Sequence, residues 1–366
     1  MKAFEIKEER FEIVREEVRR GFKNFQLEAP HQHAMYYLSY VIQDRLWTHE
    51  EKLEELEELT FEDVKNFVPQ LLRHLHIESL IHGNISQDQA KQLAQSVEAI
   101  LKPKPLLQSQ LISSRESVII DGANYVHQRS VPNKANVNSA IEYYCQVGST
   151  KDTSLRARLN LLAKITQEPC FDQLRTKEQL GYLVFSGMRN HTTTMGLRII
   201  LQSEKEPIYL ENRIEVFLEK LQTIIENMAE PEYQKHVDSL IAKKLAKNKN
   251  LWQESHRYWA HIHSGFYEFG QIDTDVQNLR NIPKSDLLKF YNEYVHPTSI
   301  HRKKVSIHLK AEKTPTDAAN TDLNQDGRDH SKLADNNEIV SDLVLFKSSL
   351  PLSKAAVPMC ELPTLE

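Results

Sequence analysis

The stretch Phe171–Arg189, FDQLRTKEQLGYLVFSGMR, decides the fold because it turns a helix into a strand. Leu174 and Glu178 belong to a helix-forming segment, and Gly181 is placed to adopt the left-handed conformation that ends many helices. The aromatic and aliphatic run Tyr182–Phe185 is typical of a strand. The sequence therefore predicts a sharp corner between a helix and a sheet.

Two long hydrogen-bond donors lie at this corner. Arg175 belongs to the last helical turns, with Phe171 one turn earlier on the same face, and Tyr182 follows the glycine. A guanidinium and a phenol close together can hold a peptide carbonyl, or the oxyanion formed from it. The alternative is an arginine paired with surface carboxylates and a tyrosine packed in the core.

The string RTKEQLGY, followed by VFSG, closely resembles the signature in the last domain of the insulin-degrading enzyme (insulysin) family, which are pitrilysin-type inverted-zincin metallopeptidases. The resemblance covers residues 1 to about 311, and a weaker match occurs in FKSSLPL at 346–352. Further matching strings occur in the family order: PHQHAMYYL at 30–38, FVPQLLRHLHIESLIHGNI at 67–85, KPLLQSQL at 104–111 and EPCF at 168–171.

The resemblance implies a domain organisation. Full-length family members have four related domains in two halves that close around a peptide, with the zinc site and the glutamate base in the first half. Residues 1–103 resemble the rear part of the third domain, which is incomplete here, and 104–311 the fourth domain. Residues 312–366 form a polar insertion and a C-terminal tail. By this resemblance Arg175 and Tyr182 reach the substrate, and Phe171 lines the pocket beside the scissile bond.

The function implied is that of the non-zinc-binding C-terminal half of a zinc metalloendopeptidase, which encloses short peptides and completes the active site. Zinc would be bound only by the half missing here, because this sequence has no HxxEH motif, and we expect the chain alone to be inactive. By resemblance the substrates are insulin-like or amyloidogenic peptides. The partner would be the missing N-terminal half or a homologue that supplies it, and a homo-oligomer is left open.

Two other readings remain. The chain is alternatively a non-catalytic peptide-binding or regulatory partner of a catalytic homologue, or a degenerate remnant. The family also suggests nucleotide or polyanion binding at a segment that matches 246–252, where Lys247 and Lys249 are the basic residues. A run of lysines is more often a solvated helix end.

Composition narrows the class of protein. Acidic residues number 51 against 46 basic ones, for a formal net charge of −5, which gives no case for nucleic-acid binding. The three cysteines have no CxxC spacing and indicate reduced thiols, and no apolar run approaches a membrane span. We therefore expect a cytoplasmic protein that binds no membrane.

Blocks of strands that alternate with long helices predict an α+β fold, a layered sandwich of antiparallel sheet and long helices. Lys102–Pro105, KPKP, is predicted to be the interdomain linker, and an apolar face or sheet edge should be exposed on the N-terminal side.

Helices are predicted over Lys7–Phe25, Met35–Trp47, Glu50–Leu59, Thr60 to Leu72 with Pro69 as a kink or boundary, Gln87–Leu101, from Leu155 to the corner, and from Pro207 and Pro231. Strands are predicted over Ile77–His82, Val118–Ile120, Tyr125–Gln128, Val137–Val147 with one face partly wet, Met195–Leu201, and Lys304–Lys310 as the last regular element.

Histidine and aspartate clusters invite a metal interpretation that the spacing does not favour. The groups are His74, His76, Glu78 and His82, then His256, His261 and His263. Neither has the HxxEH order, so polar surface or hydrogen-bonded histidines are expected. Asp322, Asn324, Asp326 and Gly327 open like a calcium loop, but Leu333 stands where a glutamate is required, so a solvated loop is expected.

Overall fold

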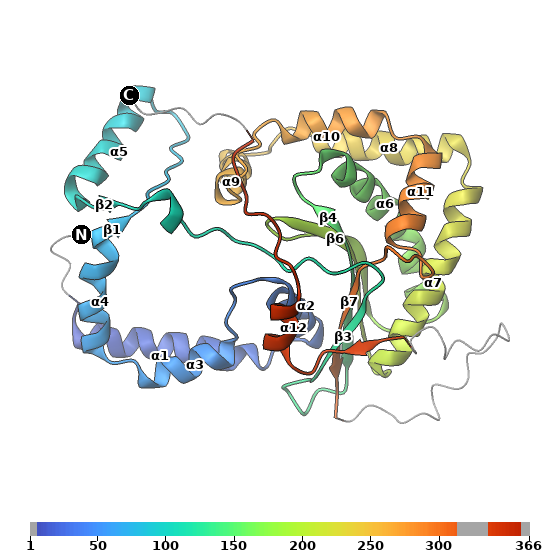
Figure 1. Ribbon diagram of the computed structural model, residues 1–366, viewed down its shortest axis with the longest axis horizontal. Coiled ribbons are helices and arrows are strands. Elements are labelled where there is room, and N and C mark those ends of the chain that lie inside the picture. The colour runs from blue at the N-terminus through green and yellow to red at the C-terminus, as the bar shows by residue number, and fades with distance from the viewer. Residues whose placement is uncertain (1–5, 313–335, 360–366) are drawn as a thin grey trace.

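A six-stranded mixed sheet forms the centre of the structure, with helices on both of its faces (Figure 1). The computed structural model describes residues 6–312 and 336–359. Along the sheet the strands are β5 (Leu183–Asn190), β6 (Thr194–Ser203), β4 (Ser139–Ser149), β7 (Lys304–Lys310), β3 (Asn124–Ser130) and β8 (Glu338–Ile339). The predicted α+β layered architecture is confirmed. The sheet is not antiparallel throughout, because β3 pairs in parallel with β7 and with β8.

Two helical layers sandwich the sheet (Figure 1). One face packs against the long helices that follow β4 in the chain, and the other against α2 (Pro30–Ile42) and α12 (Leu343–Ser349). The first layer contains α6 (Thr153–Phe171), α7 (Pro207–Asn227), α8 (Glu230–Leu245), α10 (Gln271–Arg280) and α11 (Lys284–Tyr294), with α9 (Leu251–His263) at its margin. Pro207 and Pro231 begin their helices as predicted, since a proline in the first turn removes no helical hydrogen bond.

Strand β4 is buried on both faces, so the expectation that one face is partly wet is wrong. Ile141 and Tyr143 point into the core shared with α6 and α7, whereas Ala140 and Tyr144 belong to the core shared with α2. The second cover comes from a helix about 100 residues earlier in the chain. Local alternation cannot reveal such a distant cover.

The remaining N-terminal helices form an arm that extends away from the sheet (Figure 1). It comprises α1 (Glu8–Phe25), α3 (His49–Glu58), α4 (Phe61–Arg73), α5 (Gln87–Leu101) and the parallel two-residue pair β1 (His74–Leu75) and β2 (Lys104–Pro105). Capping boxes at Thr48, Thr60 and Ser86 begin three of these helices. Apolar residues of the arm are exposed, among them Val18, Phe67, Leu93 and Ile100.

Several local predictions differ from the structure. Ile77–His82 forms no strand, and His82 Nδ1 instead lies 2.7 Å from Ser255 Oγ. Val118–Ile120 is also irregular, although Val118 N–H donates to the Pro351 carbonyl at 2.8 Å. A short apolar run has no periodicity that separates a strand from a packed loop.

Other boundaries move for identifiable reasons. The predicted helix Met35–Trp47 begins and ends five residues earlier, as α2, with Pro30 in its first turn. Helix α4 continues past Pro69 to Arg73, and Lys104–Pro105, within the predicted linker, pairs with β1. Lys304–Lys310 is not the last regular element, because β8 and α12 follow it. The domain boundary itself stays a prediction.

The corner after α6 is built from three unusual backbone features. A π-helix over Asp172–Lys177 continues α6, and Gln179 has a φ of 51°. The expectation that Gly181 takes the left-handed conformation is therefore wrong, because Gln179 takes it. Gly181 is required for a different reason: a Cβ there would lie 2.0 Å from the Gln202 carbonyl oxygen of β6.

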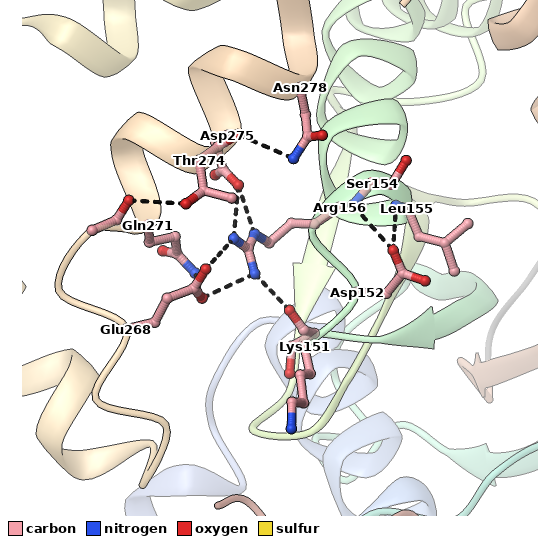
Figure 2. Close-up of polar contacts among 12 residues, drawn as sticks. Lys151, Asp152, Ser154, Leu155, Arg156, Glu268, Gln271, Thr274, Asp275 and Asn278 are labelled. Atoms are coloured by element: carbon pink, nitrogen blue, oxygen red, sulfur yellow. Dashed lines mark hydrogen bonds and ion pairs between the residues drawn. The ribbon is translucent and has the colours of Figure 1, made fainter. Parts of the chain in front are cut away.

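A buried ion network joins α6 to α8 and α10, and Figure 2 shows its centre around Arg156, Glu268 and Asp275. Arg156 Nη2 lies 2.8 Å from both Glu268 Oε1 and Asp275 Oδ1, and Arg156 Nη1 donates to the Thr150 carbonyl at 2.7 Å. Lys244 Nζ completes the network at 2.8 Å from Asp275 Oδ2. Since these carboxylates are almost fully buried, each depends on its cation.

Replacing Arg156 by Met should therefore destabilise the protein by about 3–5 kcal/mol, because it leaves two buried carboxylates without their arginine. Urea unfolding followed by circular dichroism measures the change. Arg158→Met, on the same helix but less buried, is the matched control and should stay within about 0.5 kcal/mol of the wild type. Equal effects of the two substitutions would show that the network contributes nothing beyond helix packing.

Gly181→Ala should destabilise the corner by roughly 2 kcal/mol, because the added methyl group overlaps the Gln202 carbonyl and β6 must shift. Gly21→Ala is the control: no atom lies within 4 Å of a Cβ at this position in α1. There the higher helix propensity of alanine should leave the stability unchanged or raised by up to about 1 kcal/mol. A Gly181→Ala protein as stable as the wild type would contradict the close contact.

Candidate functional site

Arg175 lies between two aromatic rings at the corner, and the structure brings the three predicted site residues together. Its guanidinium carbon is 4.8 Å from the Phe171 ring centroid and 5.2 Å from that of Tyr182. Arg175 Nε donates to the Tyr182 carbonyl at 3.1 Å. Stacking and this hydrogen bond fix the direction of a long side chain that would otherwise be mobile.

The free donors of this group face solvent. Tyr182 is 88% exposed and Phe171 42% exposed, which is unusual for large aromatic residues. Within the described part of the chain, neither the Tyr182 hydroxyl nor the terminal nitrogens of Arg175 have a hydrogen-bond partner. We call Phe171, Arg175 and Tyr182 the donor cluster. It can bind a carbonyl oxygen or an anionic oxygen brought to it from outside.

An ion pair that the sequence analysis did not identify binds Glu178 of the corner to helix α7. Arg213 of α7 binds Glu178 through two bonds, Nε to Oε2 at 2.6 Å and Nη2 to Oε1 at 2.9 Å. Gln173 Nε2 donates to the same carboxylate at 2.5 Å. Leu174 and Leu180 are buried on either side. Glu178 is visible within RTKEQLGY, but no local pattern points to Arg213 as its partner.

A polar hollow of about 450 Å³ opens on the other side of Phe171. Lys164 and Asp172 line it, together with His236 of α8. Both charge signs are present, so the hollow favours neither an anion nor a cation by its charge alone. Phe171 thus borders both this hollow and the stacked guanidinium.

The two predicted anion-binding lysines lie in the segment between α8 and α9. Lys247 lines a hollow of about 460 Å³ with Lys244 and Arg257, but Glu254 and Asp273 line it too. Lys249 is outside that lining, and Lys244 is already paired with Asp275. The segment between α8 and α9 therefore offers a mixed rather than a purely basic surface.

The histidine clusters are dispersed into pairwise contacts. His76 Nε2 lies 3.5 Å from Glu78 Oε1, and the His256 ring packs on Trp252. Over residues 6–312 and 336–359, no three His, Cys, Asp or Glu side chains are grouped as a metal site requires. The calcium-like stretch at 322–333 lies outside the described residues. Among the helices that the structure describes, none has the length and apolar character to cross a membrane.

Comparisons with known proteins identify two related domains along the chain. Residues 1–55 match a family model described as the middle or third domain of peptidase M16. Residues 161–259, which include the donor cluster, match one described as domain 4 of the C-terminal lobe of PQQ synthase PqqF-like proteins. The two matches have the order that the resemblance implied.

Similar full-length proteins are much longer than this chain. Human insulin-degrading enzyme is 41% identical over 365 residues, which is 98% of this chain and 36% of that protein. The putative zinc protease mug138 of Schizosaccharomyces pombe is 33% identical over 360 residues, with the same two coverages. The chain thus spans about a third of the length of these relatives.

Solved structures support the fold. The crystal structure of pitrilysin superposes with a TM-score of 0.79 at 18% identity, covering 96% of this chain and 35% of pitrilysin. A Helicobacter pylori protease superposes with a TM-score of 0.62 at 17% identity, over 84% of this chain and 73% of that one. With the sequence matches, these similarities confirm the predicted resemblance: the chain belongs to the M16 peptidase family, as a C-terminal half similar to that of the insulin-degrading enzymes.

Proposed function

We propose that this chain is the non-zinc-binding half of an insulysin-like metalloendopeptidase, which encloses a short peptide and completes the site of peptide-bond hydrolysis. One observation carries the proposal: the Arg175 guanidinium is stacked between Phe171 and Tyr182, while its terminal nitrogens have no partner among the residues that the structure describes. A donor pair prepared in this way is what a developing oxyanion requires.

The proposed chemistry of the chain is confined to binding and charge stabilisation. A peptide carbonyl accepts hydrogen bonds from Arg175 and from the Tyr182 hydroxyl, and Phe171 packs against the neighbouring side chain. As the carbonyl carbon becomes tetrahedral, negative charge grows on its oxygen and both hydrogen bonds strengthen. The donors do not reorganise during this step, since the stacking already fixes the guanidinium.

Zinc has no matching donor set in the described part of this chain, so we assign the metal to the other half. That half would supply the metal-activated water, and it would come from a homologue or from a longer version of this protein. The exposed apolar residues of the arm, such as Val18 and Leu93, are candidates for the surface that it covers. The chain alone is then expected to be inactive.

The alternative is a non-catalytic peptide-binding or regulatory protein that uses the same donor cluster. It differs from the main proposal in that this chain binds peptides or regulates a catalytic homologue without contributing to hydrolysis itself. A preference for insulin-like or amyloidogenic peptides, anion binding at Lys247 and Lys249, homo-oligomerisation and a cytoplasmic location all remain proposals from family resemblance. One plant relative carries the word peroxisomal in its name.

The first test mixes the purified chain with a separately expressed zinc-binding half of a homologue and follows hydrolysis of a fluorogenic peptide. Activity should appear only in the mixture. Tyr182→Phe should then lower turnover roughly 100-fold, or about 3 kcal/mol, because it removes one oxyanion donor. Tyr294→Phe, a partly exposed tyrosine on α11, is the control and should leave turnover unchanged. An unaltered rate for Tyr182→Phe would refute the donor role, and zinc-dependent cleavage by the chain alone would refute the assignment of the metal.

The Glu178–Arg213 ion pair should act as a positioning pair for the donor cluster. Arg213→Met leaves Glu178 without its main cation, so the corner relaxes and kcat/KM in the mixture should fall roughly 10-fold or more. The exchanged double variant Glu178→Arg with Arg213→Glu should recover part of the loss. If the pair acts through the cluster, its effect and that of Tyr182→Phe will not add. Additive effects with a lowered melting temperature would indicate a purely structural role.

A further inference from the structure

A shallow hollow adjoins Tyr182 on the face of the sheet that α2 covers, and its volume is about 430 Å³. Helix α2 packs over the central strands β4 and β7, so the outer strands extend beyond the helix. The hollow lies between the start of α2 and this uncovered part of the sheet. Its lining is mainly apolar and comes from three elements: Met35 of α2, Leu183 and Phe185 of β5, and Ile200 of β6.

Hydrogen bonds and a cation–π contact join the walls of the hollow. The His31 backbone N–H donates to Gln202 Oε1 at 3.3 Å, and His31 Nδ1 lies 2.8 Å from the same oxygen. Because that oxygen accepts the backbone bond, Nδ1 must carry the ring proton. On the floor, Phe185 is 43% exposed, and the guanidinium carbon of Arg198 lies 5.0 Å from its ring centroid. The hollow is therefore already formed without an occupant.

An extended chain segment is the occupant that fits next to this hollow. Strand β5 is the end strand of the sheet, and in the part of the chain that the structure describes it pairs only with β6. Alternate N–H and C=O groups along its outer edge are thus available to another strand. A strand added there would project every second side chain onto the face that carries the hollow.

The charges around the hollow disfavour a basic side chain. Arg198 lines it, and the carboxylate closest to Arg198, that of Glu142, is fully buried and also bound to Arg189 at 2.6 Å. No acidic side chain lines the hollow. An apolar side chain would bury the exposed ring of Phe185, whereas a lysine would lie beside a guanidinium.

We propose that this hollow is a specificity subsite, which selects a large apolar side chain from a peptide paired in extended form with the free edge of β5. The proposal rests on the proposed function, because Tyr182 belongs to the donor cluster and also lines the hollow. It goes further by assigning the choice of residue to α2 and β5, and not to the catalytic half. Because Tyr182 is shared by the hollow and the donor cluster, the selected side chain should lie only a short way along the peptide from the carbonyl that Arg175 binds.

The test measures peptide binding to the full chain by fluorescence anisotropy. The probes are short labelled serine-glycine peptides with a single central Phe, Leu, Ser or Lys. The Phe and Leu peptides should bind roughly 10-fold or more tightly than the Ser and Lys peptides. Leu183→Asp puts a carboxylate in the hollow and should abolish or reverse the preference for Phe over Lys. Ile300→Asp changes an exposed isoleucine outside the hollow and should leave the preference intact.

Backbone N-methylation of the Phe peptide at alternate positions tests the pairing with β5. One set of positions should weaken binding at least 10-fold, because it removes the donors that face β5, and the other set should have little effect. Equal tolerance of both sets would overturn the strand pairing. An unchanged Phe to Lys ratio in Leu183→Asp, or no binding of any peptide to a chain with a normal melting curve, would overturn the subsite.

Arg175→Met and Tyr182→Phe separate this inference from the proposed function, because the phenylalanine keeps the ring that lines the hollow and removes only the hydroxyl donor. Both substitutions should weaken all four peptides by a similar factor and leave the Phe to Lys ratio unchanged. If neither weakens binding while Leu183→Asp still changes the ratio, the subsite stands and the donor role fails. If they weaken binding while Leu183→Asp leaves the ratio unchanged, the donor role stands and the subsite fails.

Discussion

The structure depends on the burial of β4 from both sides. A strand whose two faces are apolar must be covered twice, and each cover here comes from a different part of the chain. Helix α6 follows β4 directly and α7 comes after β6, while α2 precedes β4 by about 100 residues. The N-terminal segment is therefore part of the sheet's core as well as of the arm. Beyond the cover of α2 the end strand β5 is partly exposed, with Phe185 43% exposed, and the candidate site lies beside this strand.

Gln202 joins the elements that make the site. Its backbone carbonyl fills the space that a side chain at Gly181 would occupy, so it sets how closely the corner approaches β6. Its side-chain oxygen accepts hydrogen bonds from His31 and thereby fixes the start of α2. The donor cluster and the apolar hollow are consequently held against one strand residue. A shift of β6 would change both, which makes their relative position a property of the sheet and not of a flexible loop.

The sequence predicted what depends on neighbours along the chain. Helical stripes and the strand at Lys304–Lys310 are local patterns, and the helices over 7–25 and 87–101 and this strand were found at or near the predicted residues. The stacking of Phe171, Arg175 and Tyr182 also follows from local spacing around one corner. The Glu178–Arg213 pair and the contact of Gly181 with Gln202 join segments that only the tertiary fold brings together. For the same reason Gly181 was assigned a left-handed cap, although Gln179 adopts that conformation.

The buried arginines differ from Arg175 in where their hydrogen-bond donors are used. Arg302 binds Glu215 at 2.6 Å and the Tyr143 hydroxyl at 2.9 Å, and Arg156 binds two carboxylates. These arginines serve stability, because their donors are used within the fold. Arg175 is equally well fixed, but by two rings and one carbonyl that leave its terminal nitrogens uncommitted within the described residues. Ordering a long side chain costs conformational entropy, and here the donors that it orders point outward. Such an arrangement is understandable when the missing acceptor belongs to a ligand.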